Sequence, residues 1–153
     1  MLRPLDITSA DMRGELIANI EAQYGGVDIL INNAGFTFRA VVEDVSEEDR
    51  LQQMNTNFRS PMELIRLCLP NMRQKRQGKI INISSVGGQM AMPTMAVYSA
   101  SKHALEGATE SLWYELKPWN IKVTLVQPGF INSKGFEKAV SYTHLTLPTI
   151  YSV

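Results

Sequence analysis

The sequence predicts an α/β fold in which a parallel sheet is covered by helices on both faces. Three unbroken apolar runs are typical of strands, and helical stretches lie between them. Such runs suit strands that are buried on both sides. Each run is followed by a loop rich in Asn, Ser, Gly or Pro. The predicted strands are Val27–Ile31, Lys79–Ile83 and Ile121–Val126, and the loops that follow them are NNAG, SSVGG and QPG.

These three loops are expected to line one crevice. In open α/β sheets, ligands bind beyond the carboxyl ends of the strands. We therefore expect the chemistry of the molecule to lie at that edge.

The helical stretches have recognisable ends. Ser46 precedes three acidic residues, which is an N-cap followed by charges that the helix dipole favours. The next helix is expected to end near Gly78, after a basic run. The last long helix has alanine at positions 96, 100, 104 and 108, which share one face. Small side chains there would let it lie close to the sheet or to a second copy of itself.

The two ends of the chain depart from this pattern. Met1 to Thr8 is expected to form a short strand. The last fourteen residues contain no Asp, Glu, Lys or Arg, where average usage would place about three or four. Two origins of this tail stay open: Val140 to Thr149 is a translated sequencing-library adapter, or the tail is a natural β-prone segment. The underlying nucleotide sequence would distinguish them.

Composition argues against several classes of function. The 153 residues include 15 Lys+Arg and 15 Asp+Glu, so no broad basic field attracts nucleic acid or acidic membranes. Cys68 is the single cysteine, so we expect no internal disulfide, no metal site and a reduced, cytoplasmic setting. No apolar run approaches the roughly 20 residues of a membrane span, and no signal-peptide core is present. The expected partner is a small molecule or another protein.

Four signals that carry chemistry follow one another in the chain. NNAG at Asn32–Gly35 comes after the first strand, and Asn57 lies in the helical region that follows. Ser85 ends the next strand, and YSASK at Tyr98–Lys102 begins thirteen residues later. Each signal alone has a plain structural reading as a turn cap, a strand-end serine or a surface pair. Their ordered combination indicates a functional site.

This ordered set resembles the classical short-chain dehydrogenase/reductase family over about residues 2–139. The resemblance implies an oxidoreductase that transfers a hydride between NAD(P)(H) and an alcohol or carbonyl substrate. It implies a Rossmann-like doubly wound parallel sheet that is incomplete, because the first βαβ unit with its glycine-rich turn and the C-terminal elements are missing. Residues 1–139 would be a partial nucleotide-binding domain, and residues 140–153 a non-native tail. The matching pieces are LDIT, NNAG, TNFRSP, ISS, YSASK and PGFINS.

Tyr98 and Lys102 are four residues apart, so they share one face of a helix. A free phenol is a poor base at neutral pH, and a nearby ammonium favours its ionised form. Tyr98 is therefore expected to act as the acid/base, while Ser85 holds the same substrate oxygen. The resemblance implies that Lys102 also binds the nicotinamide ribose. It further implies that Asn57 positions a water that relays protons from Lys102.

The resemblance also assigns contacts with the cofactor. Asp6 and Ile7 would meet the adenine, the loop after the first strand would pass under the adenosine ribose, and PGFINS would fix the carboxamide. NAD and NADP are not distinguished. The family commonly has Gly where Ser60 stands and Thr where Ser133 stands. The full cofactor set is Asp6, Ile7, Asn33, Ala34, Gly35, Tyr98, Lys102, Pro128, Gly129, Ile131 and Ser133.

Three methionines, Met90, Met92 and Met95, cluster between Ser85 and Tyr98, where one wall of the substrate pocket is expected. Methionine is flexible and polarizable, so it suits an apolar substrate of variable shape. Core packing beneath the loop is the open alternative. The five residues named here form the expected substrate-binding set.

Two other functions stay open: a non-catalytic binding or interaction module of the same family, and an inert fragment of the enzyme. The complete set of Asn57, Ser85, Tyr98 and Lys102 favours catalysis. Without a glycine-rich turn, the 153-residue chain itself is expected to bind NADH or NADPH negligibly. The full-length form is expected to be a homo-oligomer, through the helix of Tyr98 and the helix that contains Asn57.

Overall fold

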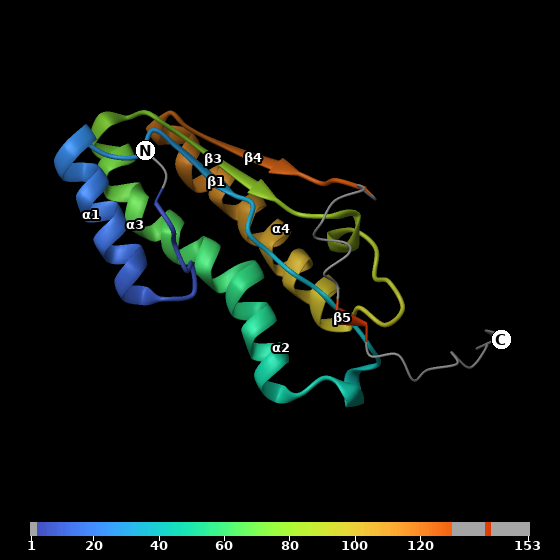
Figure 1. Cartoon of the computed structure of the whole chain (residues 1–153). Coiled ribbons are helices and arrows are strands. Elements are labelled where there is room, and N and C mark those ends of the chain that lie inside the picture. Colours follow the sequence, from blue (N-terminus) through green and yellow to red (C-terminus); the bar gives the residue numbers. More distant parts are fainter. Residues whose placement is uncertain (1–2, 130–139, 142–153) are drawn as a thin grey trace.

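The computed structural model describes residues 3–129 and 140–141 (Figure 1). Its main sheet has three parallel strands in the order β1-β3-β4, which are β1 (Ile29–Asn32), β3 (Gly78–Ile83) and β4 (Ile121–Val126). Parallel neighbours need long crossovers, and helices supply them here. The predicted α/β fold with a parallel sheet is confirmed, and each predicted strand lies within two residues of its observed bounds.

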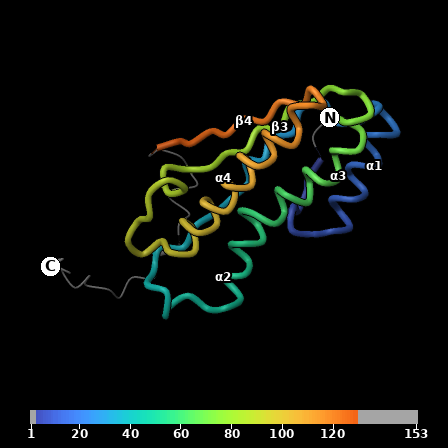
Figure 2. Tube along the Cα trace, turned by 180° about the vertical axis from the view of Figure 1, so that it is seen from behind, coloured from blue at the N-terminus to red at the C-terminus, as the bar shows by residue number. Residues whose placement is uncertain are grey.

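Four α-helices lie in the described chain, and all of them lie on the same side of this sheet (Figure 1). α3 and α4 pack on the strands, and α1 packs on α3. α2 and α3 follow one another in a single helical path beside α4 (Figure 2). The bounds are α1 (Ala10–Tyr24), α2 (Glu47–Met54), α3 (Ser60–Lys75) and α4 (Ala96–Leu116).

The opposite side of the sheet carries exposed apolar side chains. Ile29 and Ile31 on β1 are 55% and 57% exposed. The expectation that the strands are buried on both faces is therefore wrong for β1 in the described part of the chain. No described helix lies on this side of the sheet (Figure 1).

Several short elements complete the described chain. β2 (Phe38–Arg39) pairs in parallel with β5 (Val140–Ser141). A π-helical turn at Asn55–Arg59 joins α2 to α3. The 3-10 turns lie at Val42–Asp44, Val86–Gly88 and Lys117–Trp119.

The ends of the helices show where local signals succeed and fail. Ser46 caps α2 as predicted, because its side chain accepts a hydrogen bond from the Asp49 amide at 3.1 Å. α3 ends at Lys75, earlier than expected, with Arg76 in the left-handed conformation at φ 50°. Gly78 instead begins β3.

The alanine face of α4 does not lie against the sheet, so that alternative is wrong. The first two alanines, at 96 and 100, are exposed, whereas the buried side chains of α4 include Leu105, Leu112 and Leu116. Packing of this face against a second copy stays a prediction.

The strand predicted at the N-terminus is wrong for Arg3–Thr8, which forms no strand. The Asp6 carboxylate accepts hydrogen bonds from the Thr8 amide at 2.8 Å and the Thr8 hydroxyl at 2.7 Å. Such a side-chain turn competes with strand pairing. Arg13 then donates to the carbonyl of Ile7 at 2.5 Å, which holds the turn against α1.

The hydrophobic core lies between the sheet and the layer formed by α1, α3 and α4. Cys68 is part of it, and burial raises the pKa of its thiol to about 11. The buried members are Ile17, Leu64, Ile65, Cys68, Met72, Ile80, Leu112, Leu116 and Ile121.

Candidate active site

A buried polar chain joins the carboxyl ends of β1 and β3 to α4. Asn32 donates to Asn82 at 2.8 Å, Asn82 donates to Thr109 at 2.9 Å, and Thr109 donates to the carbonyl of Leu105 at 2.5 Å. Asn32, Asn82 and Thr109 are all buried. Because unpaired buried polar groups are costly, this chain of bonds favours one position of α4 along the sheet. It thereby determines where Tyr98 and Lys102 lie.

Asn57 is 1% exposed and binds the loop that follows β1. Its Oδ1 accepts from the amide of Phe36 at 3.1 Å, and its Nδ2 donates to the carbonyl of Phe36 at 2.9 Å. Nδ2 also donates to the hydroxyl of Ser101 at 3.0 Å. Asn57 lies within the π-helical turn, a feature that often occurs at functional sites. The turn ends directly before Ser60, a position at which the family commonly has glycine.

Lys102 is 5% exposed, and its Nζ donates to the carbonyl of Ile83 at 2.9 Å. Burial lowers the pKa of its ammonium from the ordinary 10.5 to about 8, although the charge of Glu106 acts to raise that pKa. In the described part of the chain, no carboxylate forms an ion pair with it. Lys102 is thus a desolvated ammonium with donors to spare, the kind of group that clusters at functional sites.

Gly35 brings the loop after β1 against this pair. A Cβ at Gly35 would lie 3.1 Å from Oδ1 of Asn57 and 3.6 Å from Nζ of Lys102. The side chains of Asn57 and Lys102 therefore meet beside the backbone of Gly35. A larger residue would force one of these polar groups to move.

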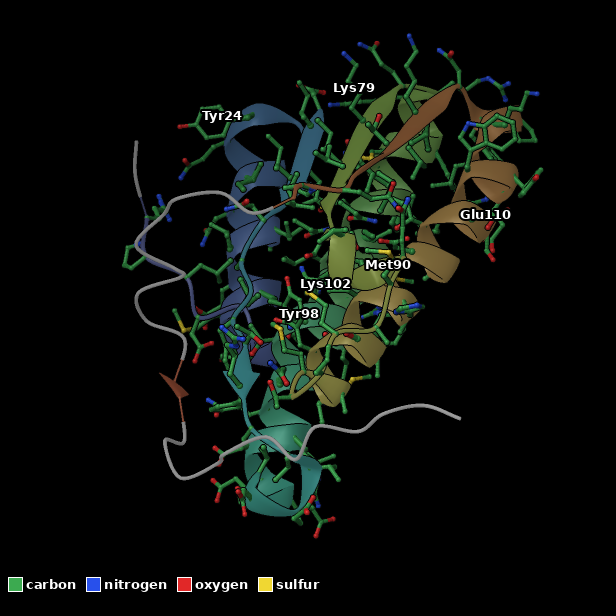
Figure 3. The ribbon with its side chains drawn as sticks, turned by 90° about the vertical axis from the view of Figure 1, so that its right-hand side faces the viewer. Tyr24, Lys79, Met90, Tyr98, Lys102 and Glu110 are labelled. Carbon is green, nitrogen blue, oxygen red and sulfur yellow. The ribbon has the colours of Figure 1, made fainter. Side chains whose placement is uncertain are left out.

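Tyr98 and Ser85 meet at Gly87. The hydroxyl of Ser85 accepts from the amide of Gly87 at 3.1 Å, and a Cβ at Gly87 would lie 3.1 Å from Cε1 of Tyr98. Nζ of Lys102 lies 5.9 Å from the centroid of the Tyr98 ring. Figure 3 shows Tyr98 and Lys102 side by side, well removed from Lys79 at the start of β3. The four side chains that the sequence singled out thus lie in one region, at the carboxyl ends of β1 and β3.

The residues expected to contact the cofactor are more dispersed. Asp6 is exposed, and its hydrogen bonds with Thr8 lower the pKa of its carboxyl, while Ile7 is half-buried. The loop residues Asn33, Ala34 and Gly35 are exposed directly after β1. The carbonyl of Pro128 accepts from the amide of Val86 at 2.9 Å, and Gly129 is exposed. Ile131 and Ser133 lie outside the described residues.

The three methionines have different surroundings. The Cε of Met92 lies 3.1 Å from the position that a Cβ of Gly87 would take, and Tyr98 approaches the same position. Met90 is 62% exposed. Met95 is half-buried and lines a small cavity with Phe38 and other residues of that segment. Their contact with a substrate stays a prediction.

Sequence reasoning missed three contributors to this site. Ser101 donates to the carbonyl of Tyr98 at 2.7 Å while it accepts from Asn57, and it is fully buried. Its position three residues after Tyr98, on the same helix face, was a usable signal. The backbone of Phe36 and the small residue Gly87 left no such signal, since their roles depend on the folded arrangement.

Among the described residues, no group of three or more His, Cys, Asp or Glu side chains is placed to hold a metal ion. No helix in the same part of the chain is long and apolar enough to cross a membrane.

Comparison with known proteins identifies the family. The sequence model described as short chain dehydrogenase matches residues 1–142. The 3-ketodihydrosphingosine reductase of Bacteroides thetaiotaomicron is 44% identical over 142 residues, which are 93% of this chain and 52% of that protein. A probable short-chain type dehydrogenase/reductase, VdlC of Helicobacter pylori, is 40% identical over 149 residues, 97% of this chain and 55% of that protein. The chain spans about half the length of these curated relatives.

Solved structures agree with these relatives. A short-chain dehydrogenase from Streptomyces avermitilis superposes with a TM-score of 0.84 at 37% identity, covering 92% of this chain and 52% of that one. A gluconate 5-dehydrogenase from Burkholderia cenocepacia, in complex with NADP and tartrate, gives a TM-score of 0.81 at 29% identity, covering 85% and 51%. The chain belongs to the short-chain dehydrogenase/reductase family.

Proposed function

We propose that this chain carries the catalytic part of an NAD(P)(H)-dependent oxidoreductase that interconverts an alcohol and a carbonyl compound. The main support for the proposal is the environment of Lys102. Lys102 is a buried ammonium with no carboxylate partner in the described chain, and it lies beside both Tyr98 and the exposed loop at Gly35. A solved relative with NADP bound supports the choice of cofactor.

Several of the described residues suit parts of a dinucleotide. The free donors of Lys102 suit the hydroxyls of a ribose, and the missing side chain of Gly35 permits close approach of a ligand to the backbone. The exposed Asp6 carboxylate, whose bonds with Thr8 both use Oδ1, suits the amino group of an adenine. Asn33, Ala34, Pro128 and Gly129 would complete the contacts, with Ile7, Ile131 and Ser133.

The chain's own residues then provide the acid/base chemistry. A bound nicotinamide supplies or accepts the hydride at the substrate carbon. During reduction, Tyr98 gives its hydroxyl proton to the carbonyl oxygen as that carbon receives the hydride, and during oxidation Tyr98 takes the proton back. Ser85 holds the same oxygen. The ammonium of Lys102, 5.9 Å from the centroid of the Tyr98 ring, would replace that proton through a water that Asn57 positions.

A non-catalytic binding module explains the site less well. Burying an ammonium without a carboxylate partner destabilises a fold. In a protein that transfers no protons, nothing would offset that loss of stability. Catalysis supplies the reason, because a lysine with a pKa of about 8 can exchange protons near neutral pH.

The proposal is tested in a chimera in which residues 3–129 of this chain replace the matching stretch of the Bacteroides relative. The scaffold then supplies whatever a complete enzyme needs beyond this chain. We expect turnover of NADH or NADPH with a ketone, and a loss of at least about 100-fold in kcat for Tyr98→Phe. Tyr114→Phe, an exposed tyrosine on the same helix, is the matched control. An active chimera in which Tyr98→Phe retains full turnover would refute the role of Tyr98.

For the substrate, we propose an apolar carbonyl compound, because Met92 and Tyr98 both approach Gly87 and Met90 is exposed in the same loop. In the chimera, a long-chain ketone should have a higher kcat/KM than a sugar ketone. Met92→Gln should reduce that preference, whereas Met72→Leu in the core should not. A preference for the sugar would show that the methionines only pack beneath the loop.

A further inference from the structure

Glu106 lies on α4 one helical turn beyond Lys102, and both of its carboxylate oxygens are engaged. The hydroxyl of Ser84 donates to Oε1 at 2.6 Å, and the Nε2 of Gln127 donates to Oε2 at 2.7 Å. Gln89 in turn donates to Oε1 of Gln127 at 2.9 Å. One carboxylate therefore joins α4 to the loop after β3 and to the end of β4.

The surroundings are shaped around this carboxylate. A Cβ at Gly88 would overlap Oε1 of Glu106 and would lie 2.6 Å from the hydroxyl of Ser84. Ser84 itself is 5% exposed, so its hydroxyl depends on Glu106 for a partner. Ser84 is the residue directly before Ser85, and Gly88 closes the same turn by donating its amide to the carbonyl of Ser85 at 2.9 Å. Movement of the Ser84 side chain would thus move Ser85.

We propose that Glu106 is a positioning residue, which sets the hydroxyl of Ser85 against Tyr98 by holding Ser84 on α4 and which holds the Pro128–Gly129 stretch through Gln127. The proposal rests on the proposed function, because the role of Ser85 belongs to it. Tyr98, Lys102 and Glu106 follow at intervals of four, so they share one face of α4. Glu106 would thereby fix the loop after β3 in position relative to Tyr98 and Lys102.

A carboxylate suits this position better than an amide. Ser84 and Gln127 both donate, so the residue between them needs two acceptors, and only a carboxylate has them. A glutamine would accept from Ser84 but would present an N–H to the N–H of Gln127. Hydrogen bonds to a charged acceptor are also about twice as strong as neutral ones.

The first test measures amide hydrogen exchange in the 153-residue chain. Glu106→Gln should raise exchange by about tenfold or more at the amides of Gly88, Gln89 and Met90, which close the turn after Ser85. Glu110→Gln, on an exposed residue one turn further along α4 (Figure 3), should leave these amides unchanged.

A compensating double variant distinguishes loss of these particular hydrogen bonds from a general destabilisation of the fold. In Glu106→Gln with Gln127→Glu, the new amide can donate to the new carboxylate and still accept from Ser84. This double variant should restore protection of the turn amides to within about threefold of wild type. Ser84→Ala, which removes one bond only, should give an intermediate effect and serves if Glu106→Gln does not fold. The proposal is overturned if Glu106→Gln behaves like Glu110→Gln, or if core amides of β3 lose protection equally.

A second readout does not depend on packing. Because the charge of Glu106 raises the pKa of Lys102, Glu106→Gln should lower that pKa further, as followed by NMR of the Lys102 side chain. An unchanged pKa of Lys102 would contradict the placement of Glu106 and Lys102 close together on one face of α4. In the chimera, the same variant should reduce kcat by about tenfold or more and should also raise the KM for NADPH, because the Pro128–Gly129 stretch loses its hold through Gln127. The two proposals can fail separately. If Tyr98→Phe retains full turnover but Glu106→Gln still raises exchange at the turn amides, the proposed function is wrong and the positioning role of Glu106 stands.

Discussion

Lys102→Met tests whether the buried ammonium of the candidate site destabilises the fold. Methionine is similar in length to lysine and has no charge, so it relieves the burial of the ammonium. The pKa of Lys102 is about 8, against the ordinary 10.5 that applies when the chain is unfolded. By linkage, such a difference corresponds to up to about 3 kcal/mol at about 1.4 kcal/mol for each pH unit.

The sign of the pH effect follows from the protons bound. Below pH 8 the lysine is protonated in both states, so the folded chain bears the full cost of a buried charge. Between pH 8 and 10.5 the unfolded chain binds a proton that the folded chain has released, so the free energy of unfolding of the wild type rises with pH. Above that window lysine is neutral in both states. The advantage of Lys102→Met should therefore shrink by up to about 3 kcal/mol from pH 7 to pH 10.5.

The assay is denaturant unfolding of both proteins at these two pH values. Methionine also leaves the carbonyl of Ile83 without its donor, which costs about 1 to 3 kcal/mol at every pH. The change with pH, and not the sign at one pH, is thus the diagnostic quantity, and titrations that both proteins share cancel. Lys79→Met, at an exposed position, should show no such change. If the free energies of unfolding of wild type and Lys102→Met differ by the same amount at both pH values, Lys102 is not a destabilising buried ammonium.

Three further outcomes follow from packing. Gly88→Ala should destabilise the chain, because its Cβ would overlap the carboxylate beside it, whereas Gly107→Ala, in open space on α4, should stabilise it by about 0.5 to 1 kcal/mol; thermal unfolding compares the two. Ile80→Ala should cost about 2 to 5 kcal/mol in denaturant unfolding and the exposed Leu51→Ala less than about 0.5, and equal costs would contradict the core described here. Cys68, with a pKa of about 11, should react with a thiol reagent only as fast as the chain unfolds, and immediate labelling in native buffer would contradict its burial.

Local patterns predicted those parts of the fold that local physics determines. The three apolar runs formed β1, β3 and β4 because short apolar runs rich in β-branched residues favour strands, although one face of β1 is exposed. Ser46 could be placed as a cap because an N-cap bond spans only three residues. The family was also predicted correctly, since the order and spacing of its motifs are properties of the sequence itself.

Long-range contacts left no comparable signal. Asn32, Asn82 and Thr109 are 50 and 27 positions apart, so their buried chain of bonds appears only once β1, β3 and α4 are packed. The strand predicted at the N-terminus failed for another reason, which is the turn at Asp6. The Asp6 side chain competes locally with strand pairing, and the apolar pattern does not reveal that competition.

In the proposed reaction, Tyr98 provides the proton for a hydride transfer to a substrate carbon. The most direct measurement supplies the chimera with reduced nicotinamide cofactor that carries deuterium at its transferable position, and determines deuterium in the alcohol product by mass spectrometry. We expect one deuterium on the carbinol carbon with Tyr98 in place, and at least about 100-fold less labelled product with Tyr98→Phe. Alcohol formed without deuterium, or equal labelling by both proteins, would contradict this expectation.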